Sequence, residues 1–465
     1  MIRIFLYSIA LFLPFCAFSS EAAKPNVIYI LADDLGYGEV GYNGQTMIQT
    51  PELDRLAAQG MRFTAHYCGS SVCAPSRCIL MTGKHAGHAY IRANSPGYPN
   101  GQTPIPADSE TLGKLMQRAG YTTACIGKWG LGSAWNSGDP NAQGFDHFFG
   151  YYDQRNAHNY YPEFLWRNGE KVLLEGKHYS HDLMSEEAFR FVAENREQPF
   201  FLYLAYTIPH TQYQVPELGQ YAEKDWPENM KIHAAMTSRM DRDIGQLTRL
   251  LEELGLAENT LILFNSDNGA HGQFGSEKFF NTSGELRGVK RSMYEGGVRS
   301  PMFAYWPETI TAGTVSDHLS AFWDMLPTFS ELTGEPIQSE TDGISILPTL
   351  LGKPELQKQH DYLYWELYEK TPNQGLRMGK WKGVVLNRRK GQKIELYDLS
   401  ADAGEQTNLA KDYPEVVDRI RKAMNSAHTP NPFWDKDNGK MLFNKKAAQT
   451  VTGETEATGD AWLKN

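Results

Sequence analysis

The sequence predicts an α/β fold: a large mixed, mainly parallel sheet flanked by helices, followed by a smaller C-terminal antiparallel α+β domain. Two observations support this prediction. Short continuous apolar runs, typical of fully buried strands, alternate with longer segments of helical periodicity. After about residue 352 the pattern changes to short strands followed by one helix. Strands that alternate with helices favour a parallel sheet, because a parallel connection needs a crossover segment.

The individual elements follow from these patterns. The apolar runs that predict strands of the large sheet are residues 26–31, 200–206, 261–264 and 301–306. The segments between them that predict helices are 51–59, 111–119, 181–194 and 233–254. In the C-terminal region, strands are predicted at 362–365, 379–386 and 394–399, and a helix at 414–427.

Length and composition support a globular chain of more than one unit. The 465 residues include 45 Lys+Arg and 55 Asp+Glu, a formal net charge of −10, with 41% hydrophobic residues. These values exclude a disordered, collagenous or coiled-coil protein. We predict a signal peptide at 1–22, an α/β domain at 23–352, an α+β subdomain at 353–429 and a polar tail at 430–465.

The N-terminus has the pattern of a secretory leader. Arg3 precedes an apolar run over residues 4–18, which is short for a membrane span, and small residues follow it. We expect cleavage near Ser19 or Ala22 and a soluble exported protein, periplasmic or secreted, without membrane contact. An uncleaved anchor is the alternative.

The acidic residues are unevenly distributed. Net acidity argues against a nucleic-acid partner. Residues 55–107 nevertheless contain no Asp or Glu, while five Lys or Arg and three His lie there. This stretch is either a solvated face or a pocket for an anionic substrate. The five cysteines are too few for a disulfide scaffold.

Polar side chains follow three of the predicted strands. Asp33 and Asp34 follow the first, His210 follows the second, and Asp267 and Asn268 follow the third. Ligands of open α/β sheets bind at the carboxyl ends of strands. Carboxylate and amide oxygens suit Ca²⁺ or Mg²⁺, and three converging carboxylates repel one another without a cation. Taken singly, the Asp pair is also typical of a helix cap, and His210 of a core histidine.

One short motif carries the strongest chemical signal. Cys73-Ala74-Pro75-Ser76-Arg77 is followed by Thr82-Gly83. A cysteine beside an arginine is compatible with an activated thiolate, and a helix starting after Pro75 would favour negative charge at Cys73. Spacing alone does not decide the chemistry.

The motif resembles the signature of the type I, formylglycine-dependent sulfatases of the alkaline phosphatase-like superfamily, with Met81 where leucine is usual. The resemblance implies that a formylglycine-generating maturation enzyme oxidises Cys73. In that family a hydroxyl of the hydrated aldehyde attacks the sulfur of a sulfate ester, with one Ca²⁺ bound. The region 396–409 also resembles the end module of the family.

A second family signature lies at residues 120–129 and carries Lys128, which by resemblance contacts the sulfate. The family commonly has a histidine two residues later, where this chain has Gly130. His88 and His158 are the candidates to substitute for it.

The resemblance also implies the remaining roles. Arg77 would stabilise the nucleophile, His210 would contact the leaving group, and Lys290 would be the second sulfate-binding lysine. His158 and His271 are further candidates for substrate contact. The implied metal ligands are Asp33, Asp34, Cys73, Asp267 and Asn268.

We therefore expect a calcium-dependent sulfatase acting on a sulfated polysaccharide or oligosaccharide. The alternatives are a phosphatase or phosphonate hydrolase of the same superfamily, and an inactive protein that binds sulfated glycans. The sequence makes no prediction about the oligomeric state.

Overall fold

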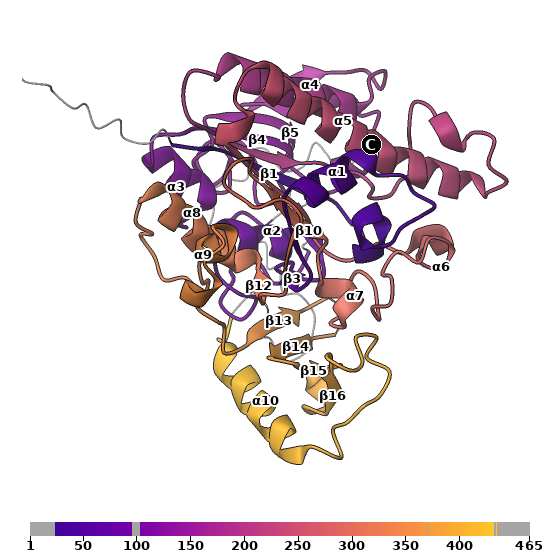
Figure 1. The fold of residues 1–465 in the computed structure, drawn as a ribbon, viewed down its shortest axis with the longest axis vertical. Helices are drawn as coiled ribbons and strands as arrows, with labels where there is room; N and C mark the ends of the chain where they lie inside the picture. Colours follow the sequence, from indigo (N-terminus) through magenta and orange to yellow (C-terminus); the bar gives the residue numbers. More distant parts are fainter. Residues whose placement is uncertain (1–23, 95–102, 370, 432–433, 435–465) are drawn as a thin grey trace, which may run out of the picture.

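The computed structural model describes residues 24–94, 103–369, 371–431 and 434. A ten-stranded sheet dominates it (Figure 1). In spatial order its strands are β11 (Thr314–Ser316), β2 (Met61–Phe63), β10 (Met302–Tyr305), β9 (Thr260–Ser266), β1 (Asn26–Ala32), β8 (Phe200–Ala205), β4 (Thr122–Lys128), β5 (His147–Tyr151), β6 (Phe164–Arg167) and β7 (Glu170–Leu173). The strands from β9 to β5 are mutually parallel, whereas β10, β6 and β7 run antiparallel to their neighbours. The predicted mixed, mainly parallel sheet is confirmed.

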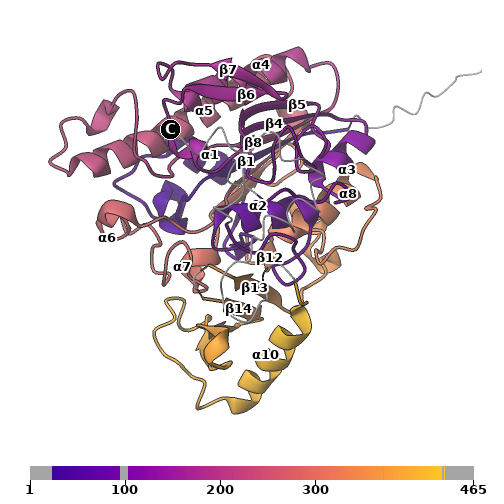
Figure 2. The same cartoon turned by 180° about the vertical axis from the view of Figure 1, so that it is seen from behind.

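Helices cover both faces of this sheet (Figures 1 and 2). Side chains of β1 alternate between two cores: Tyr29 belongs to one and Ile30 to the other. The first core includes residues of α2 (Cys73–Thr82), α3 (Leu112–Arg118) and α8 (Met325–Thr333), and the second includes residues of α1 (Pro51–Gln59), α4 (Ser180–Glu194) and α5 (Glu228–Glu253). Burial on both faces explains why the central strands are continuously apolar.

The C-terminal module is a four-stranded antiparallel sheet with one helix, at the bottom of Figure 1. Its strands are β13 (Leu363–Leu367), β14 (Asn373–Met378), β15 (Trp381–Val385) and β16 (Ile394–Asp398), and its helix is α10 (Pro414–Ala427). Ile420 and Met424 of the helix pack on Leu376 and Leu396 of the sheet. The predicted antiparallel sheet with one helix is therefore present.

The remaining elements are short. They are β3 (His66–Tyr67), which pairs with β12 (Ser320–Ala321), the helices α6 (Ser276–Phe279), α7 (Glu295–Val298) and α9 (Leu347–Leu350), and the 3-10 helices Tyr37–Glu39, Gly41–Asn43, Asn156–His158, Gly219–Tyr221, Ala257–Asn259, Gln273–Gly275, Phe322–Asp324, Pro354–Leu356 and Arg388–Lys390.

Several boundaries differ from the prediction. Helix α2 begins at Cys73 itself, not after Pro75, and α5 begins five residues before the predicted position 233. Strand β14 was not predicted, because its sequence NQGLRM follows Pro372 and has the composition of a turn. The predicted leader and most of the predicted tail lie outside the described residues. Within the described residues, no helix combines the length and apolarity needed to cross a membrane.

Candidate active site

Four adjacent parallel strands bring the predicted polar residues to one edge of the sheet. The order β9-β1-β8-β4 places the carboxyl ends of these strands side by side. Lys128 is the last residue of β4, and Asp33 directly follows β1. Backbone hydrogen bonds continue the register past the strand ends: Asp267 N donates to Ala32 O at 3.1 Å. The sequence-based expectation that these ends converge is correct.

Helix α2 places Cys73 at the same edge. Cys73 is the first residue of the helix, and every residue of the helix is buried. Gly83 ends it in the left-handed conformation, with φ of 65°. The Lys290 ammonium donates to the Cys73 sulfur at 3.2 Å, and that sulfur lies 3.6 Å from Asp33 Oδ1.

Buried ion pairs connect the carboxylates to cations. Lys128 Nζ lies 2.5 Å from Asp33 Oδ2, and Lys290 Nζ lies 2.7 Å from Asp34 Oδ1. Arg77 donates to Asp267 Oδ2 at 2.8 Å and to the Lys128 carbonyl at 2.6 Å.

Burial determines the state of the cysteine. It raises the pKa of the Cys73 thiol to about 12, and the charges of Lys128 and Lys290 offset only part of this effect. The unmodified residue is therefore a protonated thiol at neutral pH. The alternative of an activated thiolate is not supported.

The pKa values of the three carboxylates in the cluster are shifted in opposite directions. Burial opposes ionisation of Asp33, but the charges of Lys128 and Arg77 hold its pKa well below the usual range. The pKa of Asp34 is likewise lowered, by the charge of Lys290 against the effect of burial. Burial and the charge of Asp33 raise the pKa of Asp267. Three carboxylates this close together therefore need additional positive charge nearby before all three can be ionised at the same time.

The residues fit an oxygen-coordinated cation. Asn268 Oδ1 is buried and lacks a hydrogen-bond partner within the described residues, while its Nδ2 donates to Asp34 Oδ1 at 2.6 Å. Ligand atoms of Asp33, Asp34, Cys73 and His210 lie within 4.8 Å of one another. A buried amide oxygen without a partner beside clustered carboxylates suits a hard divalent cation such as Ca²⁺.

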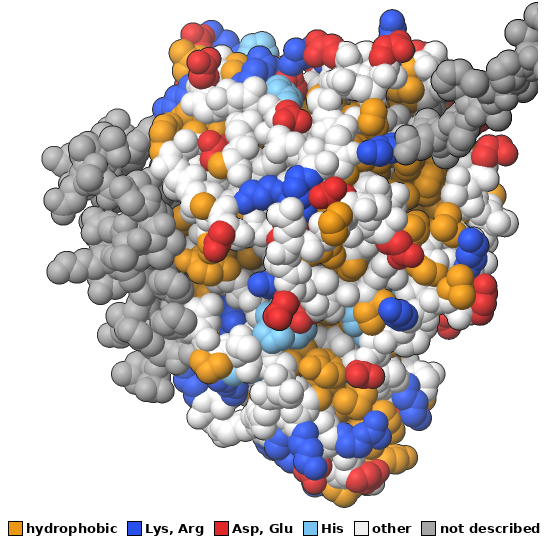
Figure 3. All heavy atoms as spheres, turned by 90° about the vertical axis from the view of Figure 1, so that its left-hand side faces the viewer, with side chains coloured by type: hydrophobic (Ala, Val, Ile, Leu, Met, Phe, Trp, Pro, Cys, Tyr) orange, Lys and Arg blue, Asp and Glu red, His pale blue; other side chains and the backbone are white. Residues whose placement is uncertain are grey.

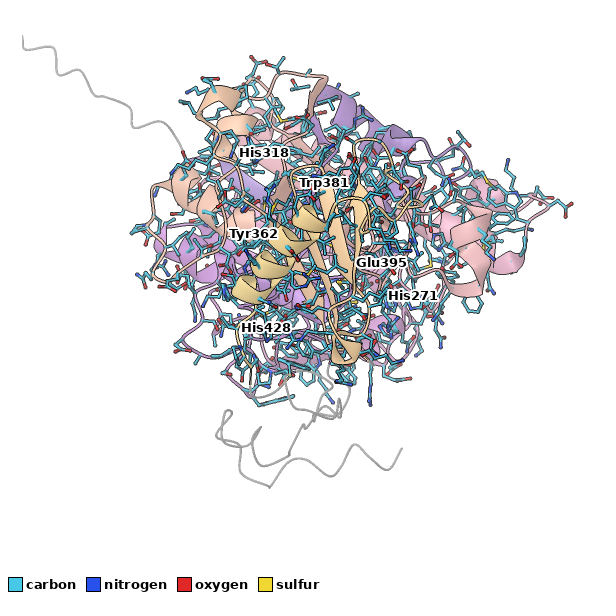
Figure 4. All side chains as sticks on the ribbon, turned by 90° about the horizontal axis from the view of Figure 1, so that it is seen from below. His271, His318, Tyr362, Trp381, Glu395 and His428 are labelled. Carbon is cyan, nitrogen blue, oxygen red and sulfur yellow. The ribbon has the colours of Figure 1, made fainter. Side chains whose placement is uncertain are left out.

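A cavity of about 240 Å³ opens onto Cys73. The side chains that line it are Cys73, Asn94, Gln154, Arg155, His158, His210, Thr211, His271, Gln273, Lys290 and Arg291. The rings of His158 and His210 stack at 4.0 Å, and His271 lies 5.4 Å from His210. Figure 4 shows His271 to the side of the C-terminal module rather than behind α10.

The histidines of the cavity are held neutral. Burial lowers the pKa of His210 well below its ordinary value and that of His158 to about 4. His210 Nδ1 contacts the Thr211 carbonyl, so that nitrogen carries the proton.

Not every predicted substrate contact lines the cavity. His158, His210, His271 and Lys290 do, but Lys128 is fully buried against Asp33 and is not among the lining residues. Of the two candidates to replace the missing histidine, His158 lies in the cavity. His88 does not; it binds Asp342 at 2.8 Å instead.

The acid-free stretch contributes less charge to the site than its composition indicates. Arg55 pairs with Glu52, and Arg92 with Glu366, both away from the cavity. The cations that line the cavity are Arg155, Lys290 and Arg291, which come from other segments. Over the face shown in Figure 3, described residues of both charge signs are interspersed. The stretch supplies the cysteine and Arg77 rather than a basic surface.

The sequence-based reasoning did not identify six lining residues: Asn94, Gln154, Arg155, Thr211, Gln273 and Arg291. All but Gln273, the first residue of a 3-10 helix, lie in loops, and their residue types are common there. His158, which the sequence did identify, lies four residues after Gln154. Asn94 Oδ1 accepts from Ala74 N at 3.0 Å, beside the cysteine.

Fold and site together define a hydrolase of esters of an anionic group. Comparison with known proteins identifies the class: residues 25–335 match the sulfatase family, and residues 287–429 match the C-terminal domain of N-sulphoglucosamine sulphohydrolase. The chain therefore belongs to the sulfatase family and is a sulfuric ester hydrolase.

Individual relatives span most of the chain. Human arylsulfatase A is 32% identical, with 89% of each chain covered, and N-acetylgalactosamine-6-O-sulfatase of Bacteroides thetaiotaomicron is 28% identical, with 88% and 94% covered. The crystal structure of Ps i-CgsB in complex with k-i-k-neocarrahexaose superposes with a TM-score of 0.78 at 28% identity, covering 92% and 97%. Phosphonate monoester hydrolase of Agrobacterium radiobacter shares the fold, with a TM-score of 0.62 at 20% identity.

Proposed function

We propose that this sulfatase is an exported enzyme that removes sulfate from a sulfated oligosaccharide or polysaccharide, using a formylglycine formed from Cys73 and one calcium ion. The observation that carries the proposal is the position of Cys73. It lies at the start of a buried helix, between Asp33 and Lys290, and opens onto the cavity.

The modification suits this position. As a protonated thiol Cys73 is a poor nucleophile, and the hydrated aldehyde would supply an oxygen nucleophile instead. Arg77 holds Asp267 and the Lys128 carbonyl, and so fixes the helix against the sheet edge. The maturation enzyme acts before folding is complete in this proposal, because Cys73 is only 1% exposed in the folded chain.

The chain's own cations hold the transferred group. The charge of the neighbouring Asp34 raises the pKa of Lys290 against the effect of burial, so its ammonium stays charged over the whole working pH range. It faces the cavity and binds sulfate oxygens as their negative charge grows. His210 and His158, stacked beside it, contact the leaving-group side.

A single calcium fits the sheet edge. Asp33, Asp34, Asp267 and Asn268 would hold it through oxygen atoms, and it would polarise the oxygens bound to it. The unpaired Asn268 oxygen supports this assignment.

A carbohydrate substrate is favoured by the relatives and by the size of the cavity. One relative is named as a sulfatase of N-acetylgalactosamine, and the structure of Ps i-CgsB is a complex with an oligosaccharide. A volume of about 240 Å³ admits a sulfate group and part of a sugar ring, so the rest of the chain lies outside. Arg155 and Arg291 at the cavity suit a polyanionic substrate.

The test is sulfate release from a panel of sulfated oligosaccharides by protein coexpressed with a maturation enzyme. We expect release by the wild type, loss after calcium chelation with recovery on adding Ca²⁺, and activity at least about 10³-fold lower for Cys73→Ser without formylglycine. Mass spectrometry of the purified protein detects both the conversion of Cys73 to formylglycine and the removal of the leader.

Two results would contradict the proposal. Phosphate release without sulfate release would favour the phosphatase alternative. Binding of sulfated glycans without cleavage, by protein in which Cys73 is fully converted, would favour the inactive binder.

A further inference from the structure

Gly130 lies beside Arg77 of helix α2, the helix that begins with Cys73. Gly130 has φ of 81°, a conformation that favours glycine. A Cβ at this position would lie 2.9 Å from Nε2 of Gln154 and 3.9 Å from Cδ of Arg77. The side chain of Gln154 therefore occupies the space that a side chain at residue 130 would enter.

The sheet register brings these two residues together. Strands β4 and β5 are parallel, and their pairing continues beyond the last strand residues, since Gly130 N donates to Tyr152 O at 3.1 Å. The chain after Tyr152 therefore passes beside Gly130 and delivers Gln154 two residues later. Gly130 and Gln154 are 24 residues apart in the sequence, and the pairing of the strands, not a local sequence pattern, brings them together.

The amide of Gln154 is unsatisfied and faces the reaction site. Its Nε2 is buried and has no hydrogen-bond partner within the described residues, and the side chain lines the same cavity as Cys73 and Lys290. A buried hydrogen-bond donor without a partner is destabilising. A group that accepts a hydrogen bond from the cavity side would remove this cost.

We propose that Gln154 is a sulfate-binding residue: its Nε2 donates a hydrogen bond to an oxygen of the transferred sulfate, and Gly130 is required because any side chain there displaces this amide. The inference rests on the proposed function, which places the sulfate in this cavity. A neutral amide suits the position, because Lys290, Arg155 and Arg291 already supply positive charge to the cavity and the amide adds a directed donor.

The first experiment removes the donor and keeps the size of the side chain. Gln154→Met is expected to lower kcat/KM by about 10–100-fold and to weaken inhibition by inorganic sulfate by about 10-fold. Gln154→Glu keeps the shape but places a carboxylate against an anion, so both losses are expected to be larger. Inhibition by inorganic sulfate is a binding readout that a purely structural role would not change.

The second experiment separates displacement of Gln154 from backbone strain. Gly130→Ala is compared with Gly120→Ala, where φ is 82° and the nearest atom to the added Cβ is Lys24 Nζ at 3.9 Å. Both variants bear similar strain, but only Gly130→Ala crowds the amide. We expect a loss of sulfate inhibition in Gly130→Ala alone, and no added effect of it in a Gln154→Met background.

The outcomes are distinguishable from failure of the proposed function. Wild-type kcat/KM and wild-type sulfate inhibition in Gln154→Met, at full conversion of Cys73, would overturn the inference. An additive effect of Gly130→Ala and Gln154→Met would do the same. A wild-type enzyme that releases no sulfate from any ester would instead refute the proposed function.

Discussion

At the scale of single residues, burial and pairing decide which groups are charged. Cys73 sits among three carboxylates and two lysines, yet burial keeps it a thiol. Lys290 sits in the same environment and stays an ammonium, because Asp34 pairs with it at 2.7 Å. The same degree of burial thus gives a neutral nucleophile precursor and a charged anion-binding group.

Lys290 offers a direct test at this scale. Lys290→Ala removes the cation that faces both Asp34 and the cavity, so we expect kcat/KM to fall by about 10²–10³-fold. The measurement is steady-state sulfate release at matched formylglycine content. Lys411→Ala, at an exposed position in the C-terminal module, is the control and should retain wild-type activity. Equal activity of the two variants would remove Lys290 from sulfate binding.

At the scale of elements, the ends of the strands and the start of α2 form the site. Each strand contributes side chains where it stops, because the next residues turn away from the sheet. Helix α2 contributes Cys73 at its first position and is held in place by complete burial. The position of the cysteine therefore depends on how α2 packs along its whole length.

The end of α2 tests this dependence. Gly83→Ala forces a non-glycine residue to φ of 65° and brings its Cβ to 2.8 Å from Leu326 Cδ2. Gly334→Ala is the matched control at the end of α8, with φ of 74° and no atom within 4 Å of the added Cβ. We expect the control to lose about 1 kcal/mol of unfolding free energy and Gly83→Ala about 1–3 kcal/mol more. Urea denaturation measures both; equal losses would contradict the packing argument.

At the scale of the whole molecule, buried ion pairs connect the large sheet to the C-terminal module. Arg92, in the loop after α2, pairs with Glu366 of β13 at 2.7 Å, and both side chains are at most 2% exposed. Lys382 of β15 pairs with Glu295 of α7 at 2.8 Å, again without exposure. Each module therefore contributes a buried charged side chain that pairs with the opposite charge on the other module.

Removing one member of such a pair is expected to be costly. Arg92→Met removes the arginine from the buried Glu366 carboxylate, which also bonds to Tyr364 and His428, and we expect a loss of about 3–5 kcal/mol in unfolding free energy. Adding Glu366→Gln to Arg92→Met removes the charge, and should recover at least about 1 kcal/mol.

The control for this pair lies on the surface. Arg421 pairs with Asp418 on α10, with 40% and 65% of the two side chains exposed. Arg421→Met should cost less than about 1 kcal/mol. A double variant no more stable than Arg92→Met alone would contradict a charge-based coupling of the modules.

The local sequence determined much of this protein. Apolar runs predicted β1, β8, β9 and β10, since burial on both faces leaves little room for polar residues, but β4 and β5 were not predicted. Helical periodicity predicted α1 and α10 at the observed bounds. The motif at Cys73 and the polar residues after the strands identified the cysteine and the charged cluster at the sheet edge, but six of the residues that line the cavity were not identified. These features can be predicted from the sequence because each depends on residues that are close together along the chain.

Only the tertiary structure decided the rest. It placed His158 rather than His88 in the cavity, paired Arg92 with the C-terminal module, and brought Gln154 beside Gly130. Strand β14 exists because β13 and β15 satisfy its backbone on both sides, despite a sequence typical of a turn. In each case the deciding partner is distant along the chain, so no local pattern carries the information.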